Sequence, residues 1–196
     1  AGSALTGREP LSSLGGMARP EVRALVFDVF GTVVDWRSGV AREAERVLGP
    51  LARDAGVEAD WGAVADAWRS RYQPAMDEVR SGRRAYVPLD RLHEEMLAPA
   101  LAETGLAAAA ARLTDAQRRD LAHAWRRLDP WPDAVEGLQR LKERFIVAAL
   151  SNANFALAVR MAKRAGLPWD ILLGADAVRA FKPDPAVYDG AASLLD

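Results

Sequence analysis

Cysteine is absent from all 196 residues of the sequence, and histidine occurs only twice. The first absence excludes a disulfide bond, a thiolate nucleophile and a zinc site built on cysteine. It also agrees with reducing conditions, so we expect a cytoplasmic protein. His93 and His123 have no partner at metal-ligand spacing, and we predict no metal site from them.

A charge excess of either sign is also missing, because 26 Lys and Arg residues face 27 Asp and Glu residues. This balance excludes the basic footprint that binds nucleic acid and the polycationic surface that binds anionic lipid. No apolar run approaches the roughly 20 residues that a membrane-spanning helix needs. We therefore expect a small-molecule partner, no nucleic acid and no membrane.

Residues 1–20 lack the basic start and the apolar core of a secretory signal. We interpret them as an N-terminal extension or a remnant of cloning, outside the fold. The whole sequence is 50% hydrophobic and 27% charged. This composition is typical of a globular protein with one domain, or with a domain that carries an insertion.

Three short apolar segments predict buried strands. Residues 23–30 are apolar on both strand faces, residues 145–150 follow the same pattern, and residues 171–174 form a shorter run. Strands buried on both faces are typical of a parallel sheet. The interval between the first two is longer than one crossover helix requires, so a subdomain is inserted there.

The apolar residues of the inserted segment recur at the spacing of a helix. An N-cap at Asp60 precedes apolar positions that continue to Val79, and further helices are predicted at residues 89–97, 107–111 and 114–125. We assign residues 37–130 to this helical cap, and residues 21–36 and 131–196 to the core. Core helices are predicted at 135–141 and 155–165, the latter closed by Gly166, and a final one begins at Asp184-Pro185. The fold class is α/β, a doubly wound parallel sheet with an inserted helical cap.

Ligands of such sheets bind outside the carboxyl ends of the strands. Asp28, Ser151 and Lys182 all lie at or just beyond such ends. Taken singly, they have structural explanations as a turn carboxylate, a helix cap and a solvated cation. Their common position makes them a candidate site.

The segments around these residues resemble three motifs of the haloacid dehalogenase superfamily, in the same order. They are Phe27-Asp28-Val29-Phe30-Gly31-Thr32, Leu150-Ser151-Asn152 and Phe181-Lys182-Pro183-Asp184-Pro185. The resemblance implies a nucleophilic Asp28, substrate binding by Ser151 and Asn152, and a Lys182 that holds the carboxylate. The residue chemistry agrees, because an aspartate is ionised at neutral pH and needs no base. Thr32 is expected to steady the loop around Asp28, and Ser151 to open an anion site before a helix.

Position 30 separates two reaction types. Superfamily phosphatases carry a second aspartate there, because an alkoxide leaving group needs a proton. Phe30 stands in its place, and a halide leaves without a proton. The sequence therefore resembles the type II 2-haloacid dehalogenases, which implies that Asp28 displaces halide from a short 2-haloacid and that water hydrolyses the aspartyl ester to a 2-hydroxy acid. We expect no metal and no cofactor.

Two further residues match that branch. Arg69, next to Trp68, resembles its halide-binding cap arginine, and Tyr188 stands six positions after Lys182 like its tyrosine. A surface ion pair, helix packing and a structural cap are the alternative explanations of Arg69, Tyr188 and Asn152.

The superfamily's fourth motif, an acidic loop after a fourth strand, would lie beyond Asp196. A chain that ended there would leave the first strand with an open apolar edge. We expect either a fragment or a second copy, as in a homodimer, that covers this edge. A magnesium-dependent phosphatase and a catalytically inactive module remain the alternative functions.

Overall fold

The computed structural model describes residues 21–196, so the extension proposed for residues 1–20 lies outside the described residues. The strands are β1 (Ala24–Phe27), β2 (Val34–Asp35), β3 (Asp129–Pro130), β4 (Ile146–Ser151) and β5 (Ile171–Gly174). The α-helices are α1 (Trp36–Asp54), α2 (Trp61–Ser70), α3 (Tyr72–Arg80), α4 (Leu89–Glu103), α5 (Ala107–Ala111), α6 (Asp115–Ala122), α7 (Ala134–Lys142), α8 (Phe155–Ala165) and α9 (Pro185–Leu195). Two 3-10 turns, η1 (His123–Arg126) and η2 (Ala175–Ala177), complete the order.

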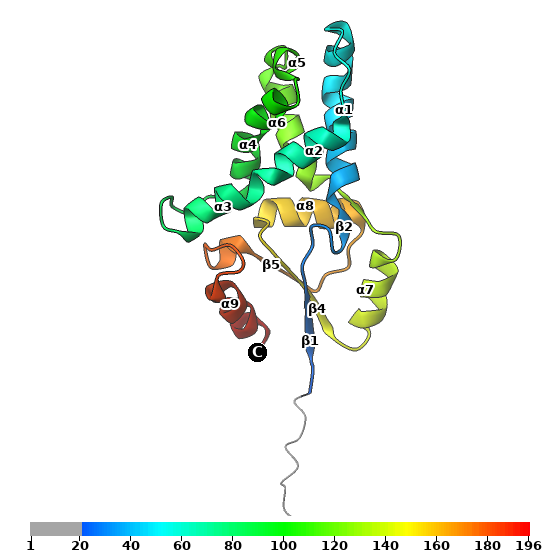
Figure 1. The fold of residues 1–196 in the computed structure, drawn as a ribbon. Coiled ribbons are helices and arrows are strands. Elements are labelled where there is room, and N and C mark those ends of the chain that lie inside the picture. The colour runs from blue at the N-terminus through cyan, green and yellow to red at the C-terminus, as the bar shows by residue number, and fades with distance from the viewer. Residues whose placement is uncertain (1–20) are drawn as a thin grey trace, which may run out of the picture.

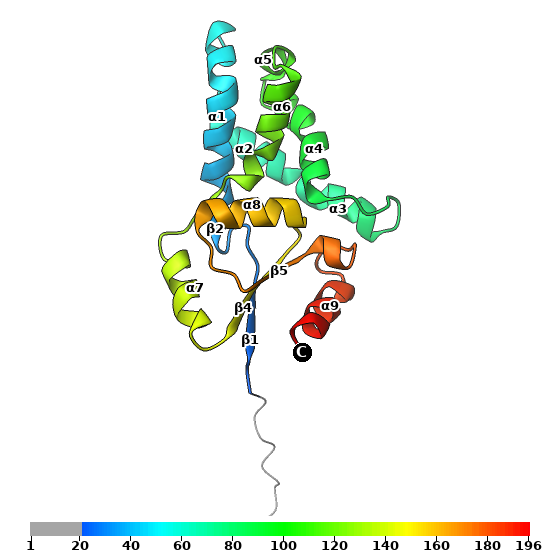
Figure 2. The same ribbon diagram turned by 180° about the vertical axis from the view of Figure 1, so that it is seen from behind.

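The core is a three-stranded parallel sheet with the order β1-β4-β5. Helices cover both of its faces, as the alternation along β4 shows. Val147 and Ala149 point into the main core with α7 and α8, whereas Ala148 and Leu150 form a smaller cluster with Val187 of α9. Figures 1 and 2 show α7 and α9 on either side of the sheet, with α8 between the sheet and the cap helices. The expected doubly wound architecture is confirmed.

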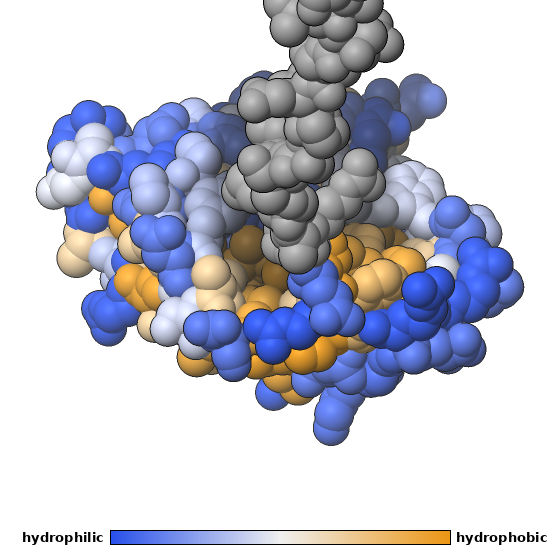
Figure 3. Space-filling view, turned by 90° about the horizontal axis from the view of Figure 1, so that it is seen from below, coloured by the Kyte–Doolittle hydropathy of each residue, from blue (hydrophilic) through white to orange (hydrophobic). Residues whose placement is uncertain are grey.

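The prediction that the first strand is buried on both faces is wrong for the described residues. β1 ends at Phe27, pairs with β4 alone, and leaves Val26 47% exposed. The reason is the position of β1 at the edge of the described sheet, because the apolar cluster around α9 includes residues of β4 and β5 and none of β1. Figure 3 shows apolar surface on the lower side of the molecule. The exposed apolar side chains of the described residues include Val22, Ile146 and Leu194.

The cap lies above the carboxyl ends of the strands (Figure 1). The chain enters and leaves it through the antiparallel pair β2 and β3. Asp60 caps α2, as its sequence position predicts, and Thr114 caps α6. The single helix expected from Trp61 to Val79 is divided at Arg71 into α2 and α3, and the long helix α1 was not predicted.

Polar contacts tie the cap to the core. The Asn154 side chain, just before α8, accepts a hydrogen bond from the Asp90 amide (3.0 Å) and donates to the Asp90 carboxylate (2.8 Å). Arg80 of α3 donates to the Lys182 carbonyl over 2.7 Å. None of the helices between residues 21 and 196 combines the length and apolar character needed to cross a bilayer.

Candidate active site

Asp28 is the first residue after β1, where the chain turns sharply. Gly31 takes φ 91°, a conformation that favours glycine, and its amide donates to the Val34 carbonyl over 2.9 Å. The turn brings Thr32 back beneath the carboxylate, and the Thr32 hydroxyl donates to Asp28 Oδ2 over 3.1 Å. The geometry therefore agrees with a Thr32 that steadies Asp28.

Lys182 approaches the same carboxylate from the loop before α9. Its Nζ lies 2.7 Å from Asp28 Oδ1 and also donates to the Leu150 carbonyl over 2.7 Å. The Lys182 backbone is fixed as well, because its amide donates to Asn152 Oδ1 over 2.7 Å. The cation is thus held against Asp28 by contacts with the ends of two strands.

Ser151 takes a different place from the expected one. Its side chain is buried, its hydroxyl accepts from the Ala153 amide over 3.1 Å, and it is not among the residues that line the cavity described below. The helix that was expected to provide an anion site begins only at Phe155, and the Phe155 amide already donates to Asp176 over 2.7 Å. Because the Ser151 oxygen accepts this bond, its O–H remains free to donate to a ligand, and substrate binding by Ser151 stays a prediction.

Asn152 links the core to the cap subdomain. The alternative considered from the sequence, a residue that only caps a helix, does not describe these contacts. While its oxygen accepts from Lys182, its nitrogen lies 3.3 Å from the Met76 sulfur of α3. Arg69 lies at the end of α2, and Tyr72, Gln73 and Met76 follow on α3, each three or four residues from another member of the group. Arg69, Tyr72 and Gln73 form the cap wall of the site, and Asp28 and Lys182 belong to its core wall.

A cavity of about 330 Å³ lies between the core residues around Asp28 and the cap residues around Arg69. Its lining residues are Asp28, Phe30, Arg69, Tyr72, Gln73, Asn152, Lys182, Pro183 and Tyr188. Six of them were proposed from the sequence, and the cavity brings them together. Tyr72 and Gln73 were missed as site residues, although their spacing from Arg69 placed them on its face.

Comparison with known proteins identifies the family of the chain. Residues 22–196 match the family of haloacid dehalogenase-like hydrolases. The chain belongs to this family.

Several of the similar proteins are 2-haloacid dehalogenases. An (S)-2-haloacid dehalogenase from Burkholderia cepacia is 34% identical over 89% of this chain and 70% of its own length. The crystal structure of a defluorinating L-2-haloacid dehalogenase is 45% identical, with a TM-score of 0.80 over 89% of this chain and 69% of that chain. An L-2-haloacid dehalogenase from Xanthobacter autotrophicus is 29% identical, with a TM-score of 0.73 over 89% of this chain and 65% of that chain.

The residues of this haloacid dehalogenase-like hydrolase do not fit a magnesium ion. Magnesium in proteins is held by carboxylate oxygens and water in octahedral geometry. Asp28 is the one carboxylate among the described residues that line the cavity, and the Lys182 ammonium lies 2.7 Å from it. Phe30 occupies the position where a second carboxylate would stand, and it packs edge-on against Trp125.

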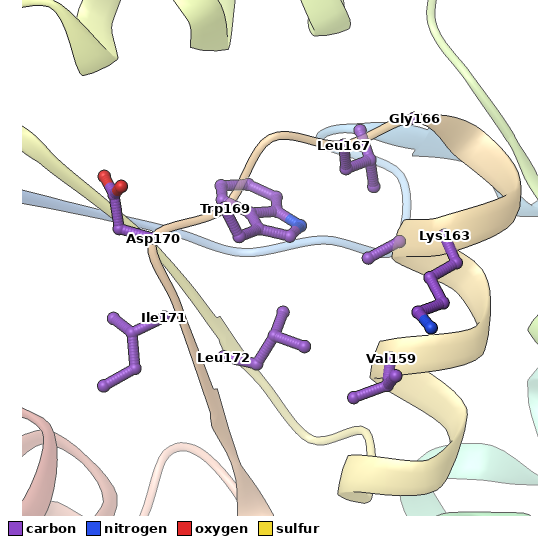
Figure 4. Close-up of a pocket in the computed structure, with 9 residues that line it drawn as sticks. Val159, Lys163, Gly166, Leu167, Trp169, Asp170, Ile171 and Leu172 are labelled. Atoms are coloured by element: carbon purple, nitrogen blue, oxygen red, sulfur yellow. The ribbon is translucent and has the colours of Figure 1, made fainter.

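A larger hollow of about 570 Å³ lies on the outer side of α8 and β5, away from Asp28 (Figure 4). Its acidic residue, Asp170, is already engaged by Lys142 at 2.8 Å and by the Val147 amide at 2.9 Å. These contacts lower the pKa of Asp170. The Asp170 carboxylate therefore links α7 to the start of β4.

His93, on the cap helix α4, is fully buried and stacks on Trp125 with ring centroids 4.4 Å apart. Within the described part of the chain, neither of its ring nitrogens has a hydrogen-bond partner. Burial lowers the pKa of His93 to about 3. The neutral imidazole is therefore the form that the folded protein keeps.

We expect His93 to make the protein acid-sensitive. Between pH 6.5 and about 3 the unfolded chain binds a proton at His93 and the folded protein does not. Lowering the pH in this window therefore favours unfolding, by on the order of 1 kcal/mol per pH unit. Thermal unfolding of wild type and His93→Phe at pH 7, 5.5 and 4 measures the effect, and the melting temperature of the variant should fall less. His123→Gln is the control, and equal slopes in wild type and His93→Phe would contradict the assignment.

Proposed function

We propose that this chain is a 2-haloacid dehalogenase, a hydrolase that acts on carbon–halide bonds. The deciding observation is the set of charged groups in the cavity. The Asp28 carboxylate is paired with the Lys182 ammonium, the Arg69 guanidinium lines the same cavity, and the other lining residues are apolar or neutral. A nucleophile is present, whereas the second carboxylate that an alkoxide leaving group would need is replaced by Phe30. This combination suits a leaving group that departs without a proton.

The first chemical step joins Asp28 to the substrate. One Asp28 oxygen attacks the halogen-bearing carbon, a carbon–oxygen bond forms, and the halide leaves with the electrons of the broken bond. Attack from behind inverts the carbon centre. The Lys182 ammonium, which touches Asp28, also attracts the carboxylate of the incoming haloacid.

The second step releases the product. Water hydrolyses the aspartyl ester, which restores the Asp28 carboxylate and gives a 2-hydroxy acid and a proton. Arg69 receives the halide in this scheme, since its guanidinium lines the wall that faces Asp28. Tyr188, 47% exposed and also part of the lining, stands at the rim, where it contacts the substrate on entry.

We expect halide release to be independent of divalent metal. Lys182 already supplies the positive charge next to Asp28, so a chelator should leave the rate of chloride release from 2-chloropropionate unchanged within about twofold. An ion-selective electrode measures the release with and without EDTA. Strict dependence on magnesium, together with hydrolysis of a phosphate monoester, would instead indicate a phosphatase. An absence of any turnover or covalent adduct would indicate an inactive module.

Two expectations remain predictions. The cytoplasmic location rests on the cysteine-free composition. The homodimer rests on the exposed edge of β1, which would accept a second strand. Sedimentation of the purified chain tests the second, and a monomer at micromolar concentration would contradict it.

A further inference from the structure

Tyr72 is built into the wall of the cavity that faces Asp28. It begins α3, three residues after Arg69, and both side chains line the cavity together with Gln73. The side chain of Tyr72 is buried, with 4% exposure. It differs in this from Tyr188, which stands at the exposed rim of the same cavity.

Stacking fixes the orientation of the Tyr72 ring. The Arg69 guanidinium lies 3.9 Å from the ring centroid, and the His93 ring stacks with it at 6.4 Å. His93 in turn stacks on Trp125. Because these neighbours are buried aromatic rings or a planar cation, the phenol is preorganised and loses little conformational freedom when a ligand binds.

Tyr72 shares the lining of the cavity with the polar side chains of Asn152, Arg69 and Asp28. Burial raises the pKa of Tyr72, Asn152 and Arg69 lower it, and Asp28 raises it. The net effect is a raised pKa, so the phenol keeps its proton at neutral pH. A neutral phenol can donate one hydrogen bond to an anion.

We infer that Tyr72 is a specificity-determining residue on the halide side of the cavity, where its hydroxyl donates a hydrogen bond to the departing halide beside the Arg69 guanidinium. The inference rests on the proposed function. Displacement sends the leaving group away from the attacking oxygen, and Arg69 and Tyr72 line the cavity from the cap helices α2 and α3, whereas Asp28 lines it from the end of β1. The halide takes both electrons of the broken bond, and Tyr72 keeps its proton throughout.

This role makes the contribution of Tyr72 depend on the halogen. A small halide concentrates its negative charge and accepts a hydrogen bond more strongly than a large one. Fluoride therefore gains most from the phenol as it departs, and bromide gains least. A residue that merely supported the fold would affect all halogens alike.

The test compares Tyr72→Phe with wild type on fluoroacetate, chloroacetate and bromoacetate. The variant keeps the ring and loses the hydroxyl, so kcat/KM for fluoroacetate should fall roughly ten- to a hundredfold, the size expected for a lost hydrogen bond to a charged group. The fall for bromoacetate should be less than about threefold. Tyr86→Phe is the matched control, because the Tyr86 hydroxyl bonds Asp176 at 2.6 Å outside the cavity, and it should keep the wild-type ratio of the three rates.

Thermal melting of each variant checks the fold. If Tyr72→Phe does not fold, Tyr72→His keeps a stackable ring and a donor, and should retain the wild-type order of halides. Equal losses on all three substrates in a folded Tyr72→Phe would overturn this inference and leave the proposed function intact. A wild-type protein that releases no halide from any 2-haloacid would overturn both.

Discussion

An Asp28→Asn variant is expected to lose halide release by at least about 10⁴-fold, because the amide keeps the shape of the side chain but removes the nucleophilic charge. The fold should survive. Asp28 is half-exposed and its contacts are one ion pair with Lys182 and one hydrogen bond from Thr32. Pairs with such exposure contribute about 1 kcal/mol or less to the free energy of unfolding. Chloride release and thermal melting of the purified variant measure both quantities.

A matched control distinguishes the loss of a carboxylate charge in general from the loss of the nucleophile. Asp66→Asn removes a carboxylate of similar exposure, paired with Arg37 on the cap surface, and should leave turnover within about twofold of wild type. Turnover of wild type in ¹⁸O-labelled water should also place the label in the Asp28 peptide, since water attacks the ester that this carboxylate forms. Retained turnover in Asp28→Asn, or label only in the product, would end the nucleophile assignment.

Local features of the fold were predictable from the sequence because they depend on neighbouring residues. Asp60 accepts from the Ala63 amide and Asp184 from the Ala186 amide, as caps do. Gly166 ends α8 with φ 67°, a conformation that few other residues adopt. The meeting of Asp28, after β1, with Lys182, in the loop before α9, could also be predicted, since parallel strands bring their carboxyl ends together.

Features that depend on tertiary packing were not predictable. Tyr72 was grouped with the apolar stripe of its helix, and only the position of the cap over the strand ends turns it toward the cavity. Val26 has the same apolar character as its neighbours, and its exposure follows from the place of β1 at the edge of the sheet. Ser151 accepts a hydrogen bond from the Ala153 amide two residues on, a contact that depends on how the chain turns after β4.

Replacing Lys182 with methionine should lower the rate of halide release by roughly 10²- to 10³-fold, the range seen when one preorganised electrostatic contact of an active site is removed. Methionine keeps much of the length and apolar stem of lysine and removes the ammonium. Asp28 would then lose its partner at 2.7 Å, and the Leu150 carbonyl would lose its donor at the same distance. The incoming haloacid would meet an uncompensated carboxylate.

The loss should appear in both KM and kcat, because the same ammonium attracts the substrate and steadies the nucleophile. Lys163→Met is the control, since Lys163 is exposed on α8 and lies outside the cavity, and its rates should match those of wild type. Lys182→Arg is the second variant. The arginine restores a positive charge in a larger group. Because the Lys182 ammonium makes two contacts at 2.7 Å, the guanidinium should recover only part of the rate. Full activity in Lys182→Met with unchanged KM would show that the positive charge at this position serves the fold and not the reaction.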